Sequence, residues 1–458
     1  MPQPEAKPRP VLLLEINEVP WRLLDRFLEH PELPHLRRFF ASSETLTTRA
    51  TDEGELSPWI TWPSFHRGIP NTEHGVQFLG QDPATFKGTA IWEEYRKKGH
   101  SIGICGSLQS WPPSDPGPGG FFVPDTFARD ERCIPAFVEP FQKFNLAQTA
   151  SNARVVNARS LYSADSLKLA LTLPRLGIRS STCLAIARQL LGERRDKTLL
   201  ARRPVFQGIL AWDIFRKLFD PTHPPTFSTY FTNHVAGVMH RYWDHVFPED
   251  FEKTPSSSAH FETMLFALRV VDQVLGDAMR YCELNPELLV VFASSMGQGP
   301  KVWKRNDGYV MTIPYVDQLM RACDLKPGEF EPLLAMVPQV CIRIEDPRKR
   351  EATRALIEGA QARSGQTFFS VEEQNDRLSI TLVTPSRTDM EAGDFRLGTK
   401  TTSWKEAGLS ANDVETGTGY HIPEGAMAVY GRGVVASDSR RPILAVEAKK
   451  MILSLSGL

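Results

Sequence analysis

The feature that most constrains the fold is the apolar run VLLLEIN at residues 11–17. It is short and uninterrupted, and a helical pattern, WRLLDRFLEH, follows it closely at residues 21–30. A continuous apolar strand of this kind is typical of a parallel sheet that helices cover on both faces. Ligands of such sheets bind beyond the carboxyl ends of the strands, which is where Asn17 and Glu18 stand. The opening therefore predicts an α/β fold whose chemistry begins just past its first strand.

Three further apolar runs repeat this pattern, namely SIGICGS (101–107), TFSTYFTN (226–233) and ELLVVFASS (287–295). Strands that alternate with helical segments predict a three-layer α/β/α domain with a largely parallel central sheet. The 458-residue chain is longer than one ordinary core requires. We predict a disordered tail (1–10), a core (11–134, 223–334 and 386–458), a helical insertion (135–222) and a small α/β cap (335–385).

Charge and cysteine usage narrow the class of function. The 53 basic and 54 acidic residues give a net charge of -1, so no global field draws the chain to nucleic acid or to an anionic membrane. The six cysteines form no C-x-x-C pair, and no uninterrupted apolar run reaches the ~18 residues of a membrane span. The N-terminus also lacks the signal-peptide pattern. We expect a cytoplasmic protein with a small-molecule or glycan substrate, no nucleic-acid partner and no membrane span, and its oligomeric state stays open.

The stretch SPWITWPSFHRGIPNTEHGV (57–76) carries the most specific motifs. It contains Thr61-Trp62-Pro63 and, shortly after, Gly68-Ile69-Pro70-Asn71-Thr72-Glu73-His74-Gly75. Together with the strand before it and the segment TAIWEEYRKKGHSIGICGSLQSWP after it, this order resembles the type I phosphodiesterase/nucleotide pyrophosphatase branch of the alkaline phosphatase superfamily. The resemblance runs from Val11 to Leu458. It implies an alkaline phosphatase-like fold and places Thr61 at the position of the family's nucleophile.

The resemblance breaks at the metal ligands. The family holds two metal ions with a strand-one Asp, the nucleophile, an Asp-x-x-x-His, an Asp-His-Gly and a late His. The corresponding positions here are Asn17, Thr61, Ala236 with His240, Ser295-Met296-Gly297, and His421. Asn, Ala, Ser and Met lack the anionic charge that two divalent ions require. We therefore expect no metal cofactor, with one alternative: a single zinc ion held by His234, His240 and His421.

Four residues are the candidates for catalysis: Thr61, Glu18, His240 and His421. Thr61 is either a nucleophile, which needs a neighbouring base, or a hydroxyl that caps the next helix. The imidazoles of His240, His421, His66 and His74 could supply that base. Glu18 is either a general acid/base or a carboxylate that stabilises a helix N-terminus. The sequence leaves both pairs of alternatives open.

A second group of residues could bind substrate. Trp59 and Trp62 could stack on a sugar or base, although aromatic side chains more often belong to the core. Lys301, Lys304 and Arg305 could replace metal charge against a phosphate, or belong to a solvated loop. Glu15, inside the first strand, requires a partner if it is buried, and Arg22, Arg67 or Arg241 could provide one. The predicted substrate-binding set is Asn17, Trp59, Trp62, His234, Arg241, Ser295 and Lys301.

Two classes of function follow. The first is a metal-independent, phosphodiesterase-like hydrolase or transferase that acts on a phosphorylated or glycosylated substrate, such as a sugar or nucleotide-sugar. The second is a non-catalytic protein of the same fold that binds such a ligand or a partner. Convergent polar groups in the pocket would favour the first class, and an apolar refilling of the pocket would favour the second. We predict that Asn17, Glu18, Thr61, His240, Ser295 and His421 form this pocket.

Overall fold

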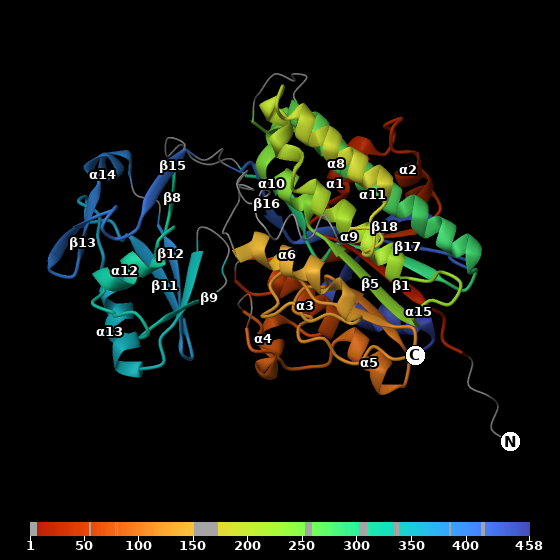
Figure 1. Ribbon diagram of the computed structural model, residues 1–458, viewed down its shortest axis with the longest axis horizontal. Helices are drawn as coiled ribbons and strands as arrows, with labels where there is room; N and C mark the ends of the chain where they lie inside the picture. The colour runs from red at the N-terminus through yellow and green to blue at the C-terminus, as the bar shows by residue number, and fades with distance from the viewer. Residues whose placement is uncertain are drawn as a thin grey trace. The chain divides into compact units, whose positions relative to one another are not determined.

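The computed structural model describes residues 7–54, 56–77, 79, 81–150, 173–251, 259–301, 309–333, 335, 339–383, 386–413 and 417–458. The chain divides into two compact units, residues 1–301 with 418–458 and residues 302–417 (Figure 1). The site described below lies entirely in the first unit. No described helix combines the length and the apolar character that crossing a bilayer requires.

An eight-stranded sheet forms the centre of the first unit, in the order β18-β2-β17-β6-β1-β5-β3-β4. The strands are β1 Val11–Ile16, β2 Glu44–Arg49, β3 Ile102–Cys105, β4 Phe121–Val123, β5 Phe227–Thr232, β6 Leu289–Ala293, β17 Glu424–Tyr430 and β18 Ser437–Leu444. β1 pairs in parallel with both β5 and β6, whereas β17 runs antiparallel to β2 and β6. The sheet is thus largely parallel, as the sequence predicts.

Helices cover both faces of this sheet. Successive residues of β1 point to opposite sides, so the strand contributes apolar side chains to a core on each face. Leu12, Leu14 and Ile16 belong to one apolar core and Val11 and Leu13 to the other. The helices of the first core are α1 Trp21–Phe27, α2 Pro34–Ala41, α9 Val205–Leu218, α10 His234–Val246 and α11 Ala259–Leu284. Those of the second are α3 Pro58–Arg67, α5 Ile91–Lys97 and α15 Ala448–Ser456. The predicted three-layer α/β/α architecture is confirmed.

The segment predicted as a helical insertion, 135–222, is helical where it is described. It contains the 3-10 helix η2 Ala136–Val138, α6 Glu139–Ala150, α8 Ser180–Gly192, the 3-10 helix η4 Lys197–Arg202 and α9; residues 151–172 lie outside the described part. α9 buries Trp212 and Phe215 in the first core, so it is part of that core. Shorter elements of the first unit are α4 Asn71–His74, η1 Pro83–Thr85, η5 Pro248–Phe251, β7 Gly297–Pro300, β16 Gly419–Ile422 and η6 Ala445–Glu447.

The second unit is wider than the predicted cap. Its core joins Met311 and Leu319 to Ile342 and Ile380, and also includes Phe395, so residues on both sides of 335–385 belong to it. A four-stranded sheet, β11-β12-β10-β9, runs through it. The elements are β8 Tyr309–Thr312, α12 Val316–Ala322, β9 Glu331–Leu333, β10 Gln339–Arg343, α13 Pro347–Glu358, β11 Phe369–Gln374, β12 Arg377–Leu382, α14 Arg387–Ala392, β13 Asp394–Leu397, β14 Lys400–Ser403 and β15 Ser410–Asp413.

The predicted tail is also shorter than expected. Residues 1–6 lie outside the described part, but Arg9 and Pro10 are held by the fold. The Arg9 amide donates to Ser456 O at 2.9 Å, and Pro10 O accepts from Leu289 N at 2.9 Å. The ordered chain therefore begins before Val11.

Candidate functional site

The carboxyl ends of three adjacent strands bring the site together. Asn17 and Glu18 follow β1, Asn233 follows β5, and Ser295 lies two residues beyond β6. α10 starts directly after Asn233 and carries His240. The last residue arrives through a small two-stranded sheet in which β16 pairs antiparallel with β7 and sets His421 opposite Gln298. Residues far apart in the chain thus converge at one edge of the large sheet.

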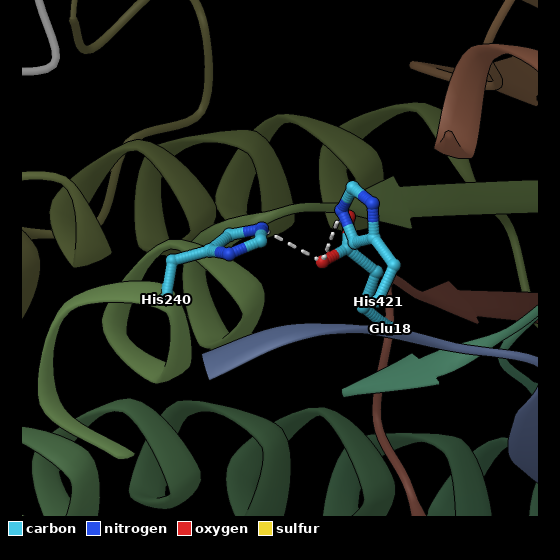
Figure 2. A group of neighbouring side chains, drawn as sticks. All are labelled: Glu18, His240 and His421. Atoms are coloured by element: carbon cyan, nitrogen blue, oxygen red, sulfur yellow. Dashed lines mark ion pairs between the residues drawn. The ribbon is translucent and has the colours of Figure 1, made fainter. Parts of the chain in front are cut away.

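Glu18, His240 and His421 form a compact cluster (Figure 2). Glu18 Oε2 lies 3.0 Å from His240 Nε2 and 3.4 Å from His421 Nε2. The two imidazole rings are 5.1 Å apart between centroids and nearly perpendicular, with an interplanar angle of 75°. One carboxylate oxygen is therefore shared between two imidazole nitrogens that come from different elements.

The other ring nitrogen of each histidine is held by a backbone carbonyl. His240 Nδ1 lies 2.9 Å from Gly419 O, and His421 Nδ1 lies 2.6 Å from Leu56 O. A carbonyl oxygen only accepts hydrogen bonds, so both Nδ1 atoms carry their proton and donate it. Each Nε2 faces the carboxylate of Glu18. The negative charge of Glu18 therefore favours positive charge at this place, supplied either by a proton or by a bound cation.

Glu18 is buried and held from all sides, with only 2% of its surface exposed. Asn17 Nδ2 donates to Oε1 at 2.8 Å, and Gln298 Nε2 donates to Oε2. Burial by itself would raise the pKa of Glu18, but the facing imidazoles of His421 and His240 and their hydrogen bonds outweigh it and hold the pKa far below its usual range. Glu18 is therefore a fixed carboxylate.

The backbone of Glu18 is strained. Its φ angle is 60°, in the left-handed region that residues with a side chain seldom occupy. Such conformations cost of order 1–3 kcal/mol and persist where the surrounding structure imposes them, often at functional sites. The strained conformation of Glu18 in the turn after β1 directs its carboxylate toward the two histidines.

The cluster is open on the side of His240. The His240 side chain is 34% exposed and that of His421 12%, compared with 2% for Glu18. Lys301 Nζ lies 3.5 Å from the centre of the Tyr420 ring, which is 4.9 Å from the His421 ring and 6.4 Å from that of His240. A lysine ammonium thus stands over a ring that lies next to both histidines, and the role of Lys301 against an anionic group stays a prediction.

The N-terminus of α3 also adjoins the cluster. Leu56, whose carbonyl binds His421, lies two residues before Pro58, the first residue of this ten-residue helix. The N-terminal end of a helix carries partial positive charge and favours anions. Imidazoles, a lysine and a helix N-terminus therefore surround the Glu18 carboxylate, a setting that suits an anionic ligand.

Thr61 lies within α3, in its first turns. The Thr61 side chain is buried, and its Oγ1 hydrogen-bonds to Ser295 Oγ at 2.8 Å. The helix begins at Pro58 behind Ser57, so Thr61 is not its cap. Trp62, the next residue, donates from Nε1 to Asn17 Oδ1 at 2.8 Å. Hydrogen bonds thus join this part of α3 both to the end of β6 and, through Asn17, to Glu18.

The two tryptophans differ in burial. Trp62 is fully buried and stacks on His66, whereas Trp59 stays partly exposed. Trp62 is therefore a core residue, and the predicted stacking on a substrate rests on Trp59 alone. Asn17 is equally committed: its amide nitrogen donates to Glu18 and to Asn233 Oδ1, the latter at 2.7 Å, and its oxygen accepts from Trp62. Asn17 positions Glu18 and has no polar atom left over for substrate.

The prediction of His234 as a third imidazole is wrong. Its side chain is buried, Nδ1 accepts from Thr232 Oγ1 at 2.6 Å, and Nε2 donates to Ala267 O at 3.0 Å. Burial lowers the pKa of His234 to about 4, so the ring stays neutral and serves the core between β5 and α11. Arg241, next to His240 on α10, is partly exposed. Lys304 and Arg305 lie outside the described residues.

The other two candidate bases, His66 and His74, serve different networks. His66 Nε2 lies 2.7 Å from Glu15 Oε1, so His66, and none of the three arginines, is the partner of Glu15. His74 Nδ1 accepts from Val76 N, which leaves the proton on Nε2 to be donated to Ser64 Oγ at 2.8 Å. Ser64 in turn donates to Asp52. Ser64 is therefore a link in a hydrogen-bonded chain between His74 and Asp52.

The described residues do not fit the two-metal centre of the family that the motifs resemble. At one of the two positions, the hydroxyls of Thr61 and Ser295 hydrogen-bond to each other. The side-chain amide of Asn17, at the same position, hydrogen-bonds to Glu18, Asn233 and Trp62. At the other, Ala236 replaces a carboxylate, and only the two histidines stay. Glu18 supplies one carboxylate there. Gln298 and Tyr420 complete the site and were not foreseen, since only the β7–β16 pairing reveals them.

No protein-family model and no curated protein sequence matches the chain. Solved structures match in overall arrangement. Murine ectonucleotide pyrophosphatase/phosphodiesterase 5, an inactive variant in complex with AMP, aligns over 98% of this chain and 95% of its own at 11% identity and a TM-score of 0.46. A variant of the alkaline phosphatase PafA aligns over 99% and 97% at 14% identity and a TM-score of 0.48. Phosphonoacetate hydrolase from Sinorhizobium meliloti 1021, with phosphonoformate, aligns over 98% and 96% at 12% identity and a TM-score of 0.41.

At 11–14% identity and TM-scores of 0.41–0.48, the chemistry of this chain rests on its own residues.

Proposed function

We propose that the chain is a hydrolase or transferase of phosphate esters whose reaction takes place at Glu18, His240 and His421. The observation that carries this proposal is the buried, ionised Glu18 carboxylate clamped between two imidazoles at the carboxyl edge of the sheet. Polar groups converge there, where a protein that had only lost an ancestral site would have refilled it with apolar side chains. An enzyme is therefore the better reading than a non-catalytic binding protein.

The charge around the cluster favours a phosphoryl group over a neutral glycosyl group. Positive charge at the two Nε2 atoms, the Lys301 ammonium and the N-terminus of α3 can neutralise phosphoryl oxygens, both in the substrate and in the transition state. Of the two tryptophans predicted to stack on a sugar, Trp62 is buried and Trp59 stays partly exposed. The substrate is thus an anionic ester.

Thr61 is the hydroxyl that we assign to the transfer step. It stands in α3 beside the cluster, and its hydroxyl is exchangeable because its partner is another hydroxyl, Ser295 Oγ. In the step, Thr61 Oγ1 forms a bond to phosphorus, the bond from phosphorus to the leaving oxygen breaks, and the leaving oxygen takes up the proton of Thr61 by way of Ser295 Oγ, so that it departs as an alcohol. Water then cleaves the phosphothreonine in hydrolysis, or a second alcohol does so in transfer.

The test is a substrate panel with mass spectrometry. The purified chain is incubated with p-nitrophenyl phosphate, bis(p-nitrophenyl) phosphate and a p-nitrophenyl glycoside, and rapidly quenched samples are digested and searched for phosphorylated Thr61. We expect turnover of a phosphate ester and a labelled Thr61. The label should be absent in Thr61→Ala, and Thr61→Ser should carry it on the hydroxyl of the substituted residue. Turnover of the glycoside alone contradicts the phosphoryl assignment. Unchanged turnover by Thr61→Ala contradicts the role of Thr61 and leaves the cluster as the site.

A further inference from the structure

We infer that Glu18, His240 and His421 hold a single divalent transition-metal ion, zinc in the first instance, with an open coordination position on the side of His240. This ligand set differs from both sequence-based expectations, metal independence and a three-histidine zinc site. It uses a carboxylate from the turn after β1 in place of His234. Binding of the ion can be measured without an activity assay. Only the role of the ion in catalysis rests on the proposed function.

The distances fit a shared metal ion. Zinc bonds of about 2.0–2.2 Å at tetrahedral angles place ligand atoms roughly 3.3 Å apart. Glu18 Oε2 lies 3.0 Å from His240 Nε2 and 3.4 Å from His421 Nε2, and the three ligand atoms lie within 4.8 Å of one another.

The orientation of the rings points the same way. Both Nδ1–H groups donate to backbone carbonyls, which fixes the tautomer whose free lone pair is on Nε2, and both Nε2 atoms face Glu18 (Figure 2). Histidines that bind a metal are commonly held by such a bond from the other ring nitrogen.

A second layer of polar groups holds the carboxylate. Gln298 Nε2 donates to Glu18 Oε2 and to Ala236 O, the latter at 3.2 Å, and Asn17 Nδ2 donates to Glu18 Oε1. Outer groups of this kind orient ligands and raise metal affinity. Because Glu18 and Gln298 are buried while His240 is 34% exposed, the unfilled coordination position faces outward. Two histidines, one glutamate and an open position are the ligand set of catalytic zinc sites.

The experiment measures metal in the full-length chain. The protein is stripped with a chelator, dialysed, and titrated with zinc chloride in a calorimeter, and bound metal is counted by elemental analysis after gel filtration. Cobalt chloride serves as a second probe, because tetrahedral Co²⁺ gives intense visible absorption bands. We expect one metal per chain and tetrahedral-type cobalt bands.

Variants assign the ligands. We expect Glu18→Gln and His421→Asn to weaken zinc binding at least about 100-fold, and Gln298→Leu to weaken it about 10–100-fold while it keeps one ion per chain. The control is His223→Asn, an exposed histidine that should bind like the parent. Circular dichroism and thermal unfolding test whether each variant is folded. If either Glu18→Gln or His421→Asn is unfolded, the zinc affinity of the other variant decides whether the ligand set is correct.

The outcomes separate the two proposals. No binding, two ions per chain, or equal binding by the parent, Glu18→Gln and His421→Asn overturns the metal site. One ion per chain together with no phosphate-ester turnover keeps the metal site and contradicts the proposed function. Full turnover by verified metal-free protein contradicts the catalytic use of the ion, even where it binds.

Discussion

Two buried glutamates stand three residues apart at the end of the same strand, and each faces histidine. Glu15 meets one imidazole, that of His66, and the two side chains are 0% and 1% exposed. Trp62, Phe65 and Trp92 surround that histidine. Glu18 meets two imidazoles, and its histidines are 34% and 12% exposed.

The difference shows which pair belongs to the core and which to the site. The Glu15–His66 pair is closed by aromatic rings, so no ligand reaches it, and its value is structural. The Glu18 cluster is open on one side. Its carboxylate is shared between two imidazole rings, and the backbone of Glu18 is strained. The same residue types therefore serve stability in one place and function in the other, and exposure separates them.

The largest expected effect is on activity, from Glu18→Gln. Removal of the carboxylate that both imidazoles share should lower turnover of a phosphate ester about 10³-fold or more, since fixed charge and orientation are lost together. The free energy of unfolding should change less than in the Glu15 variants, because the two histidines that face Glu18 are partly exposed to water. Enzyme kinetics and urea unfolding measure both. A loss of stability as large as that of Glu15 variants would break the comparison.

Glu15→Gln and His66→Leu should show the opposite profile. Leaving a buried polar group without its hydrogen-bond partner typically costs about 1–3 kcal/mol, so both variants should unfold at lower urea concentration. Turnover per folded molecule should stay at the level of the parent. A fall in turnover comparable with that of Glu18→Gln would place Glu15 and His66 in the site and remove the distinction drawn here.

The buried neutral histidines sharpen the comparison through pH. The pKa values of His234 and His74 are lowered by burial to about 4, from an ordinary value near 6.5. Between pH 6.5 and 4 the unfolded chain binds more protons at these positions than the folded chain, so stability falls as the pH is lowered. For His234 the loss is about 3 kcal/mol. Urea unfolding between pH 7 and 4.5 should show a shallower slope in His234→Gln, and an unchanged slope would contradict the assigned neutral state.

Lys301→Met should have the smallest effect. It removes one partly exposed positive charge beside the Tyr420 ring and leaves the cluster intact. We expect KM for an anionic ester to rise about 3–10-fold with kcat nearly unchanged, and the increase to shrink at high salt because exposed charges are screened. Initial rates at low and at high sodium chloride concentration test this. A lower kcat with unchanged KM would move Lys301 into the chemistry itself.

The sequence predicted much of the fold because local patterns carry it. The uninterrupted run Val11–Ile16 indicated a strand buried on both faces, and that strand lies in the middle of the sheet with one core on each side. The boundaries of the second unit were less predictable. Met311 and Phe395 join one core although they stand far apart in the chain, and no local pattern records such contacts.

For the site, the sequence by itself determined which residues stand at strand ends, since Asn17, Glu18 and Ser295 directly follow apolar runs. Only the tertiary structure decided what they do. Antiparallel pairing of β16 with β7 sets His421 opposite Gln298, and a left-handed φ at Glu18 aims its carboxylate at two histidines. His234 and His240 share one helix, yet one points into the core and the other toward Glu18. Register, backbone strain and the direction of a side chain arise from contacts between distant segments, so the residue types alone could not reveal them.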